Sequence, residues 1–194
     1  MTGKTHVAIG VAAGLTLAYG EPIDKQLIII TASSLGSLIP DLDHPKAKLN
    51  QKLLFFKNEV FRILFFIALA VGFICIYSSS KNSIFALLSL LSLFIAISSH
   101  RGFTHSILGF LIFAYITKTI SVQYNIEYLY QSVSIGYLLH LFADFLTPQG
   151  IKLFYPLNIN ISAPIIINPK SGIDELIFIL ASTYSLLILL KLVV

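Results

Sequence analysis

The chain has 194 residues, the size of one domain, and 56% of them are apolar whereas only 11% are charged. Because a water-soluble domain carries about 25% charged residues, this composition excludes both an ordinary soluble enzyme and a disordered chain. The net charge is +4, but the basic residues form no nucleic-acid-binding module, so we expect no nucleic-acid partner. The sequence predicts an integral protein of the cell (inner) membrane, with residues 1–194 as a single transmembrane domain within the lipid bilayer.

The predicted fold class is all-α, a polytopic bundle of about seven membrane helices. The helices are predicted at 5–19, 27–40, 60–78, 84–99, 104–121, 130–147 and 173–194. At 1.5 Å per residue the first two are only about 22 Å long, shorter than the hydrocarbon core of about 30 Å, whereas the other five are long enough to span it. Residues around 150–170 lack helical periodicity, so they are expected to form an irregular or hairpin-like cytoplasmic segment.

The distribution of Lys and Arg predicts the orientation of the bundle. With the amino terminus in the cytoplasm, nine of these 13 residues fall in inner segments, in agreement with the positive-inside rule. One basic stretch, residues 46–62, alternates with Leu and Phe and is predicted to lie on the membrane surface, with Arg62 at its end. A short secretory signal is the competing interpretation of the first apolar run.

Nearly all the histidines and aspartates map to the cytoplasmic ends of the predicted helices. These residues are His6, Asp41, Asp43, His44, His100, His105, His140 and Asp144. Charged groups at a membrane boundary are costly, so a cluster of them needs partners or a function. Cys75 is the only cysteine, which leaves His and carboxylate as the ligands of any metal held within one chain.

The spacing of these residues fits a metal site. His140 and Asp144 are four residues apart, so they point the same way from one helix. The predicted metal ligands are His6, Asp41, Asp43, His44, His105, His140 and Asp144. Imidazole and carboxylate favour zinc, with manganese as the alternative, and the number of ligands allows one or two ions. A structural role, as a helix cap or a hydrogen-bonded pair, is the alternative for each residue taken alone.

Two segments share the pattern G-x-T-H-x-x-x-G, at Gly3–Gly10 and Gly102–Gly109. A second polar residue, Asp41 or His140, lies 35 residues after the His of each pattern. This spacing predicts an internal duplication, with coincidence as the alternative, and each Thr is expected to cap a helix whose first turn carries the His. The two duplicated helical hairpins would be 3–44 and 102–148.

Four ordered strings carry a resemblance to a known family. They are Thr5-His6, the string from Ile39 to Pro45 (IPDLDHP), that from His100 to Ser106 (HRGFTHS) and that from Gly136 to Gly150 (GYLLHLFADFLTPQG). On these strings the chain resembles the YdjM-like family of membrane-bound metal-dependent hydrolases, over most of its length. The resemblance implies an integral membrane protein with metal-dependent hydrolase activity, and it leaves the substrate open.

Three residues are predicted to take part in catalysis: His100, Arg101 and Asp43. Arg101 precedes the amino end of a helix, where a guanidinium and unpaired N–H groups suit a phosphate, although a topological anchor is the alternative. His100 and Asp43 are candidates for proton transfer. For His44 and His100, the alternative to binding the metal directly is to orient a ligand or to transfer a proton.

The sequence therefore predicts a hydrolase that cleaves an ester or phosphoester of a lipid, such as a phospholipid, or of a lipid-linked substrate, with a metal-activated water at the cytoplasmic face. The alternative is a non-catalytic divalent-metal-binding protein with a structural, sensing or transport role. Transport is disfavoured because helices three to five carry no acid or His in their outer halves. The sequence leaves open the oligomeric state and whether Asp174 or Glu175, at the start of the last helix, joins the site.

Overall fold

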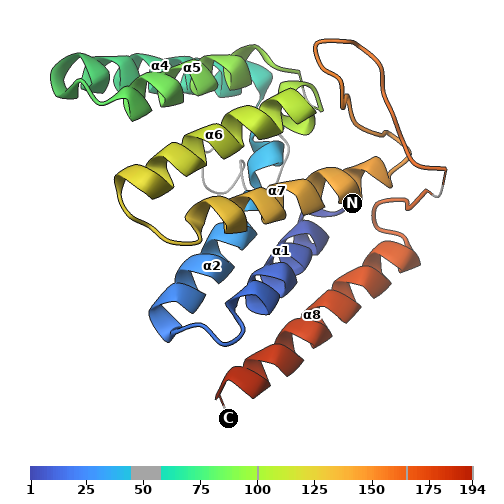
Figure 1. The fold of residues 1–194 in the computed structure, drawn as a ribbon. Helices are drawn as coiled ribbons and strands as arrows, with labels where there is room; N and C mark the ends of the chain where they lie inside the picture. The colour runs from blue at the N-terminus through green and yellow to red at the C-terminus, as the bar shows by residue number, and fades with distance from the viewer. Residues whose placement is uncertain (45–57, 100, 165, 194) are drawn as a thin grey trace.

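The computed structural model describes residues 1–44, 58–99, 101–164 and 166–193. Within these ranges the chain forms seven α-helices and two short 3-10 helices, and no β-sheet (Figure 1). The elements are α1 (Gly3–Ala18), α2 (Ile23–Gly36), η1 (Ile39–Asp43), α4 (Glu59–Ser80), α5 (Ser83–Ile97), η2 (Phe103–His105), α6 (Ile107–Gln123), α7 (Leu129–Phe145) and α8 (Gly172–Val193). The all-α class predicted from the apolar runs is confirmed.

The helices pack as two hairpins on either side of a central helix, α7. On one side α1 and α2 form a hairpin against α7, and α8 lies along α1; on the other side α6 contacts α7, and the α4–α5 hairpin lies beyond α6 (Figure 1). The apolar core between α4, α5, α6 and α7 includes Phe66, Ile95, Phe113 and Tyr137. The amino terminus lies beside the carboxyl-terminal half of α7, close to the start of α8.

Two of the helices are long and apolar enough to cross a membrane, namely α4 and residues Gly172–Lys191 of α8. Their outward faces carry large apolar side chains, such as Leu64, Val71 and Leu186, each more than half exposed. α5, α6 and α7 have 15, 17 and 17 residues, about 22–26 Å at 1.5 Å per residue. They are shorter than the bilayer core, which corrects the expectation that they are long enough to span it. α1 and α2 are short, as predicted, with 16 and 14 residues.

Small residues let α1, α2 and α7 approach closely. A Cβ atom at Gly136 of α7 would overlap the carbonyl oxygen of Ser33 in α2, and a Cβ at Gly36 would overlap the carbonyl of Val133 in α7. The Ser33 hydroxyl also donates to the Gly10 carbonyl of α1 at 2.8 Å. Close backbone contact through Gly and Ser is a common way for membrane helices to associate, and here it brings the end of α2 against the middle of α7.

Arg62 does not lie on the surface, which corrects the prediction for the basic stretch 46–62. Its side chain is buried in the first turns of α4, and the guanidinium donates to the carbonyls of Ile95 at 2.6 Å and Ser98 at 3.0 Å. Arg62 thus binds the otherwise unpaired carbonyls at the end of α5, where a cation is favoured by the helix dipole. The rest of the predicted stretch, up to residue 57, lies outside the described residues.

The segment between α7 and α8 is irregular, as predicted. Its only described strand-like contact is an antiparallel bridge between Ile151 and Ile161, which exchange two backbone hydrogen bonds of 3.0 and 2.9 Å. The Ala163 amide donates to the carbonyl of Phe145, at the end of α7. The segment therefore leaves α7, turns back and is anchored where it started before α8 begins.

Candidate metal centre

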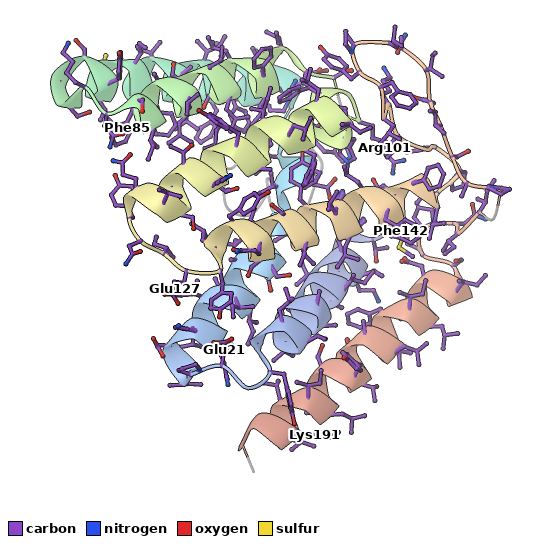
Figure 2. All side chains as sticks on the ribbon, in the orientation of Figure 1. Glu21, Phe85, Arg101, Glu127, Phe142 and Lys191 are labelled. Atoms are coloured by element: carbon purple, nitrogen blue, oxygen red, sulfur yellow. The ribbon has the colours of Figure 1, made fainter. Side chains whose placement is uncertain are left out.

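Five of the predicted ligands meet at one end of the bundle. They are His6 at the start of α1, Asp41 in η1, His105 in η2, and His140 and Asp144 in the last turns of α7. Arg101 lies at the same end, far from Glu21 and Glu127 at the other end (Figure 2). Among the described residues, two groups have ligand atoms within 4.8 Å of one another: His6, His140 and Asp144, and Asp41, His105 and His140.

His140 presents one particular ring nitrogen to this cluster. Its Nδ1 lies 2.7 Å from the carbonyl oxygen of Ser37, at the end of α2. Because a carbonyl can only accept, Nδ1 carries the proton and Nε2 holds the lone pair. The ring is fully buried and stacks on the His6 ring with centroids 3.9 Å apart, so its orientation is fixed from two directions.

His105 is oriented by a chain of two hydrogen bonds. The Thr104 hydroxyl donates to Oδ2 of the buried Asp43 at 2.6 Å and lies 3.1 Å from Nδ1 of His105. A hydroxyl has one proton, and here the carboxylate takes it, so the Thr104 oxygen accepts from Nδ1–H of His105. The Tyr137 hydroxyl donates to the Thr104 carbonyl. Nε2 of His105 therefore faces the cluster, as in metal sites whose histidines are held by a carboxylate behind them.

The two Nε2 atoms and two carboxylates have spacings that suit a small cation. Nε2 of His105 lies 3.3 Å from Nε2 of His140. Oδ2 of Asp144 is 3.5 and 3.8 Å from these two atoms, and Oδ1 of Asp41 is 3.9 Å from each. In a tetrahedral zinc site with bonds of 2.0–2.1 Å, neighbouring ligand atoms are about 3.3 Å apart. The donor types and the spacings around the two Nε2 atoms therefore suit a divalent metal ion, with Asp41 and Asp144 in different groups of ligand atoms.

Asp144 links the cluster to three further groups. Its Oδ1 lies 3.2 Å from Nε2 of His6 and 2.9 Å from the amino group of Met1, and its Oδ2 lies 3.2 Å from the Arg101 guanidinium. Arg101 also donates to the Thr147 hydroxyl at 3.0 Å and to the Gly150 carbonyl at 2.8 Å. The guanidinium thus joins the carboxylate of Asp144 to the turn that follows α7.

The electrostatic environment raises the pKa of His105. Burial by itself lowers this pKa, but hydrogen bonds and charges from Asp144 and Asp43 outweigh it, so the pKa is about 9. Without an ion, His105 is therefore protonated at neutral pH, and its Nε2–H points at the lone pair of His140 and at Asp144. A metal ion bound at Nε2 would take the place of that proton.

The remaining predicted residues lie around the cluster or outside it. Oδ2 of Asp43 lies 3.8 Å from Nδ1 of His105, and His44 is the residue directly after η1. Neither Asp43 nor His44 belongs to the two groups of ligand atoms found among the described residues. His100 lies outside the described residues. Asp174 accepts from the Thr5 hydroxyl at 2.9 Å, and Glu175 pairs with Lys4 at the exposed surface. Both acids therefore connect α8 to α1.

The expectation that Thr caps each His-bearing helix is wrong. Thr104 and Thr5 donate to the aspartates Asp43 and Asp174 instead. His105 lies in η2, and α6 begins only at Ile107, with the Ser106 hydroxyl accepting from the Gly109 amide at 3.0 Å. The internal duplication stays a prediction.

Sequence reasoning missed the groups that orient the two central imidazoles. Ser37 acts through its backbone carbonyl, and a backbone carbonyl has no sequence signature. Thr104 does have a sequence signal, because Thr104-His105 repeats the pair Thr5-His6. Arg101 has a φ of +59°, an uncommon conformation for a non-glycine residue, and its guanidinium pairs with Asp144.

Comparison with known proteins agrees with the membrane fold. The model of the YdjM inner membrane protein family matches residues 1–193. The chain is 31% identical over 187 residues to the uncharacterized protein YvsG of Bacillus subtilis strain 168, covering 95% of this chain and 93% of that protein. It is 27% identical over 179 residues to the inner membrane protein YdjM of Escherichia coli K12, covering 89% of this chain and 74% of that protein, and the figures are the same for YdjM of Shigella flexneri.

No solved structure matches the chain. The family match extends over all the described helices, from α1 to α8, and over the four strings on which the resemblance was based. The chain therefore belongs to the YdjM family of inner membrane proteins.

Proposed function

We propose that this protein is a metal-dependent hydrolase that holds one divalent ion, zinc in preference to manganese, at the cytoplasmic end of the bundle. The observation that carries the proposal is the pair of buried Nε2 atoms 3.3 Å apart, each within 4 Å of carboxylates from Asp41 and Asp144. When bound, a divalent ion supplies Lewis acidity that polarises an ester or phosphoester and activates water.

The tautomer of His140 supports a single ion. Its Nδ1 is engaged by the Ser37 carbonyl, so Nε2 is the ring nitrogen that remains for a metal. Both groups of ligand atoms include His140, and they therefore compete for the same lone pair. We take Asp41, His105, His140 and Asp144 as the ligands and place His6 beside them, where it holds Oδ1 of Asp144 and covers one face of the His140 ring.

Arg101 supports a phosphate-bearing substrate. Its terminal nitrogens hold Asp144, Thr147 and the Gly150 carbonyl, while its Nε is buried and has no hydrogen-bond partner among the described residues. An unpaired buried donor on a guanidinium is costly unless a ligand uses it, and a phosphoryl oxygen is its natural acceptor. Because the cluster lies at the end of a bundle of apolar helices, the proposed substrate is a lipid or a lipid-linked molecule from the bilayer.

The test is turnover by the purified full-length chain in lipid nanodiscs. We expect hydrolysis of at least one member of a panel of phospholipids and isoprenoid phosphates, lost with a chelator and restored by Zn²⁺ or Mn²⁺. His140→Gln and Asp144→Asn are expected to lose both bound metal and turnover. The matched control is Asp24→Asn, which makes the same chemical change at an exposed position of α2 and is expected to retain both.

A second candidate function is a structural ion that stabilises the bundle. The observation that favours it is the complete burial of the His105 and His140 side chains, which restricts access to the ion. In that case removing the ion lowers the thermal unfolding midpoint, and the metal-loaded protein turns over no substrate in the panel. Loss of turnover together with an unchanged unfolding midpoint would instead favour the hydrolase.

A further inference from the structure

The irregular segment after α7 carries a short hairpin, residues 151–161, that is tied at its base to the end of the bundle holding the metal centre. Ile151 and Ile161 are bridged, and the Ile107 amide at the start of α6 donates to the Leu153 carbonyl at 3.0 Å. Just before the hairpin, the Gly150 carbonyl accepts from Arg101. In Figure 1 the segment projects beyond the ends of α5 and α6.

The hairpin separates its apolar side chains into two sets. Ile151 is buried, and Leu153 and Tyr155 pack against the apolar core. Phe154, Leu157 and Ile159 point outward, with 51%, 58% and 55% of their surfaces exposed. Three large apolar side chains exposed on one short hairpin form a surface that water does not favour, and such surfaces mark contact sites. The first set explains why the hairpin is ordered, and the second set needs a partner.

The charges around the hairpin indicate what that partner is. The sequence has no Asp or Glu between Asp144 and Asp174, whereas Lys152 lies in the hairpin and Lys170 lies just before α8. Apolar side chains flanked by Lys, without acids, are typical of segments that bind the anionic surface of a bilayer. The irregular segment is followed by α8, whose first turns also expose the apolar side chains of Ile173 and Leu176. Residues Gly172–Lys191 of this helix are long and apolar enough to face lipid.

The backbone sets the depth of this contact. Apart from the single bridge, the hairpin has turns and extended residues without regular secondary structure. Such backbone leaves N–H and C=O groups that need water or headgroups, so it is excluded from the hydrocarbon centre where it would face lipid. The side chains of Phe154, Leu157 and Ile159 are long enough to reach the acyl boundary while the backbone stays among the headgroups.

We propose that the 151–161 hairpin is a membrane-docking element, which inserts Phe154, Leu157 and Ile159 into the interfacial layer of the leaflet next to the metal centre. The hairpin holds this end of the protein at the lipid surface and, through Gly150 and Arg101, connects that contact to Asp144. The proposal does not depend on which ion or substrate the centre takes.

The test measures the depth of single labels in vesicles of phosphatidylethanolamine and phosphatidylglycerol. In a Cys75→Ser background, which removes the only cysteine, Leu157→Cys and Ile159→Cys each carry an environment-sensitive fluorophore. Two exposed positions serve as references: Gln149→Cys, in the turn before the hairpin, and Leu186→Cys, on the outward face of α8. Size-exclusion profiles and thermal unfolding midpoints check that each labelled protein is folded.

We expect labels at Leu157 and Ile159 to be quenched best by lipids with a nitroxide near the headgroup, and to be shielded from aqueous iodide. The label at Gln149 is expected to remain open to iodide, and the label at Leu186 to be quenched best by a nitroxide deep in the acyl chain. Equal iodide quenching at Leu157, Ile159 and Gln149 would overturn the proposal. Shielding that disappears when the protein is diluted in lipid would also overturn it, since a second copy of the chain would then be the partner.

Discussion

At the scale of single residues, the two central imidazoles are held by different kinds of acceptor. His140 is fixed by a backbone carbonyl, that of Ser37, whereas His105 is fixed by the side chain of Thr104 backed by Asp43. The second arrangement can be removed by one substitution without touching a candidate ligand. Thr104 therefore offers a direct test of whether orientation of His105 matters for ion binding.

We expect Thr104→Val to weaken zinc binding by about 10- to 100-fold, the usual effect of losing a group that orients a metal-binding histidine. Valine has nearly the same shape but leaves Nδ1–H of His105 and the carboxylate of Asp43 without their shared partner. Thr104→Ser should restore most of the affinity. Competition with a fluorescent zinc chelator measures the affinity. Thr117→Val is the control, because among the described residues that hydroxyl bonds to carbonyls of its own helix, α6. Equal affinities for the two Val variants would contradict the orienting role.

The raised pKa of His105 predicts how zinc binding depends on pH. Below about pH 9 the imidazole is protonated without the ion, so binding must displace a proton, and the apparent affinity should rise about tenfold per pH unit. Above the pKa this proton is already lost, and the dependence should flatten. Chelator competition across this range measures the slope, and His105→Gln should reduce it. An affinity that does not change between pH 7 and about 9 would show that the ion does not displace a proton from His105.

Residue identities were the part of the site most accessible to sequence reasoning. His6, Asp41, His105, His140 and Asp144 stand out because ionisable groups are rare in so apolar a chain, and the topology places them at one end. Their division of roles was not accessible. Asp43 is close in sequence to Asp41, yet it lies on the far side of His105 and binds Thr104, because that depends on how η1 meets η2 in space.

At the scale of elements, the crossing of α2 and α7 places the site. Gly136 lies one helical turn before His140, at the point where α7 touches the backbone of Ser33. The same contact brings the Ser37 carbonyl to the His140 ring. The spacing of the two helices therefore controls the hydrogen bond that orients His140 in the candidate metal centre.

We expect Gly136→Ala to lower stability by about 1–3 kcal/mol, the usual cost of overpacking, and to weaken metal binding as well. The added methyl group would force α7 away from Ser33 and lengthen the hydrogen bond from His140 to Ser37. Thermal unfolding in detergent and zinc titration measure the two effects. Gly72→Ala is the control, since a Cβ there meets no atom within 4 Å; the same response from both variants would refute the argument.

Helix positions were predictable to within a few residues, because apolar runs are long and the breaks between them are polar or contain Gly and Pro. The start of α6 was misplaced by three residues, at 104 instead of Ile107. The sequence suggested Thr104 as the cap, but Ser106 takes that role because the aspartate Asp43, which is distant in sequence, captures the Thr104 hydroxyl. Tertiary hydrogen bonds of this kind override local capping preferences.

At the scale of the whole molecule, the arrangement predicts the number of ions. Because both ligand groups require Nε2 of His140, purified protein should contain about one zinc per chain when fully loaded, as measured by elemental mass spectrometry. His140→Gln should reduce this content to near zero, while Asp24→Asn should not change it. Two ions per chain in the parent protein would contradict the shared-ligand argument.

The contact between His6 and Asp144 has a consequence for biosynthesis. His6 lies in α1 and Asp144 in the last turn of α7, so most of the chain must be synthesised before the carboxylate meets its imidazole. Newly inserted α1 and α2, with η1 after them, already hold His6 and Asp41, whereas both central histidines come later in the chain. The proposed ion site can therefore be completed only after α7 has been synthesised and inserted, and a chain arrested before that helix should bind no ion there.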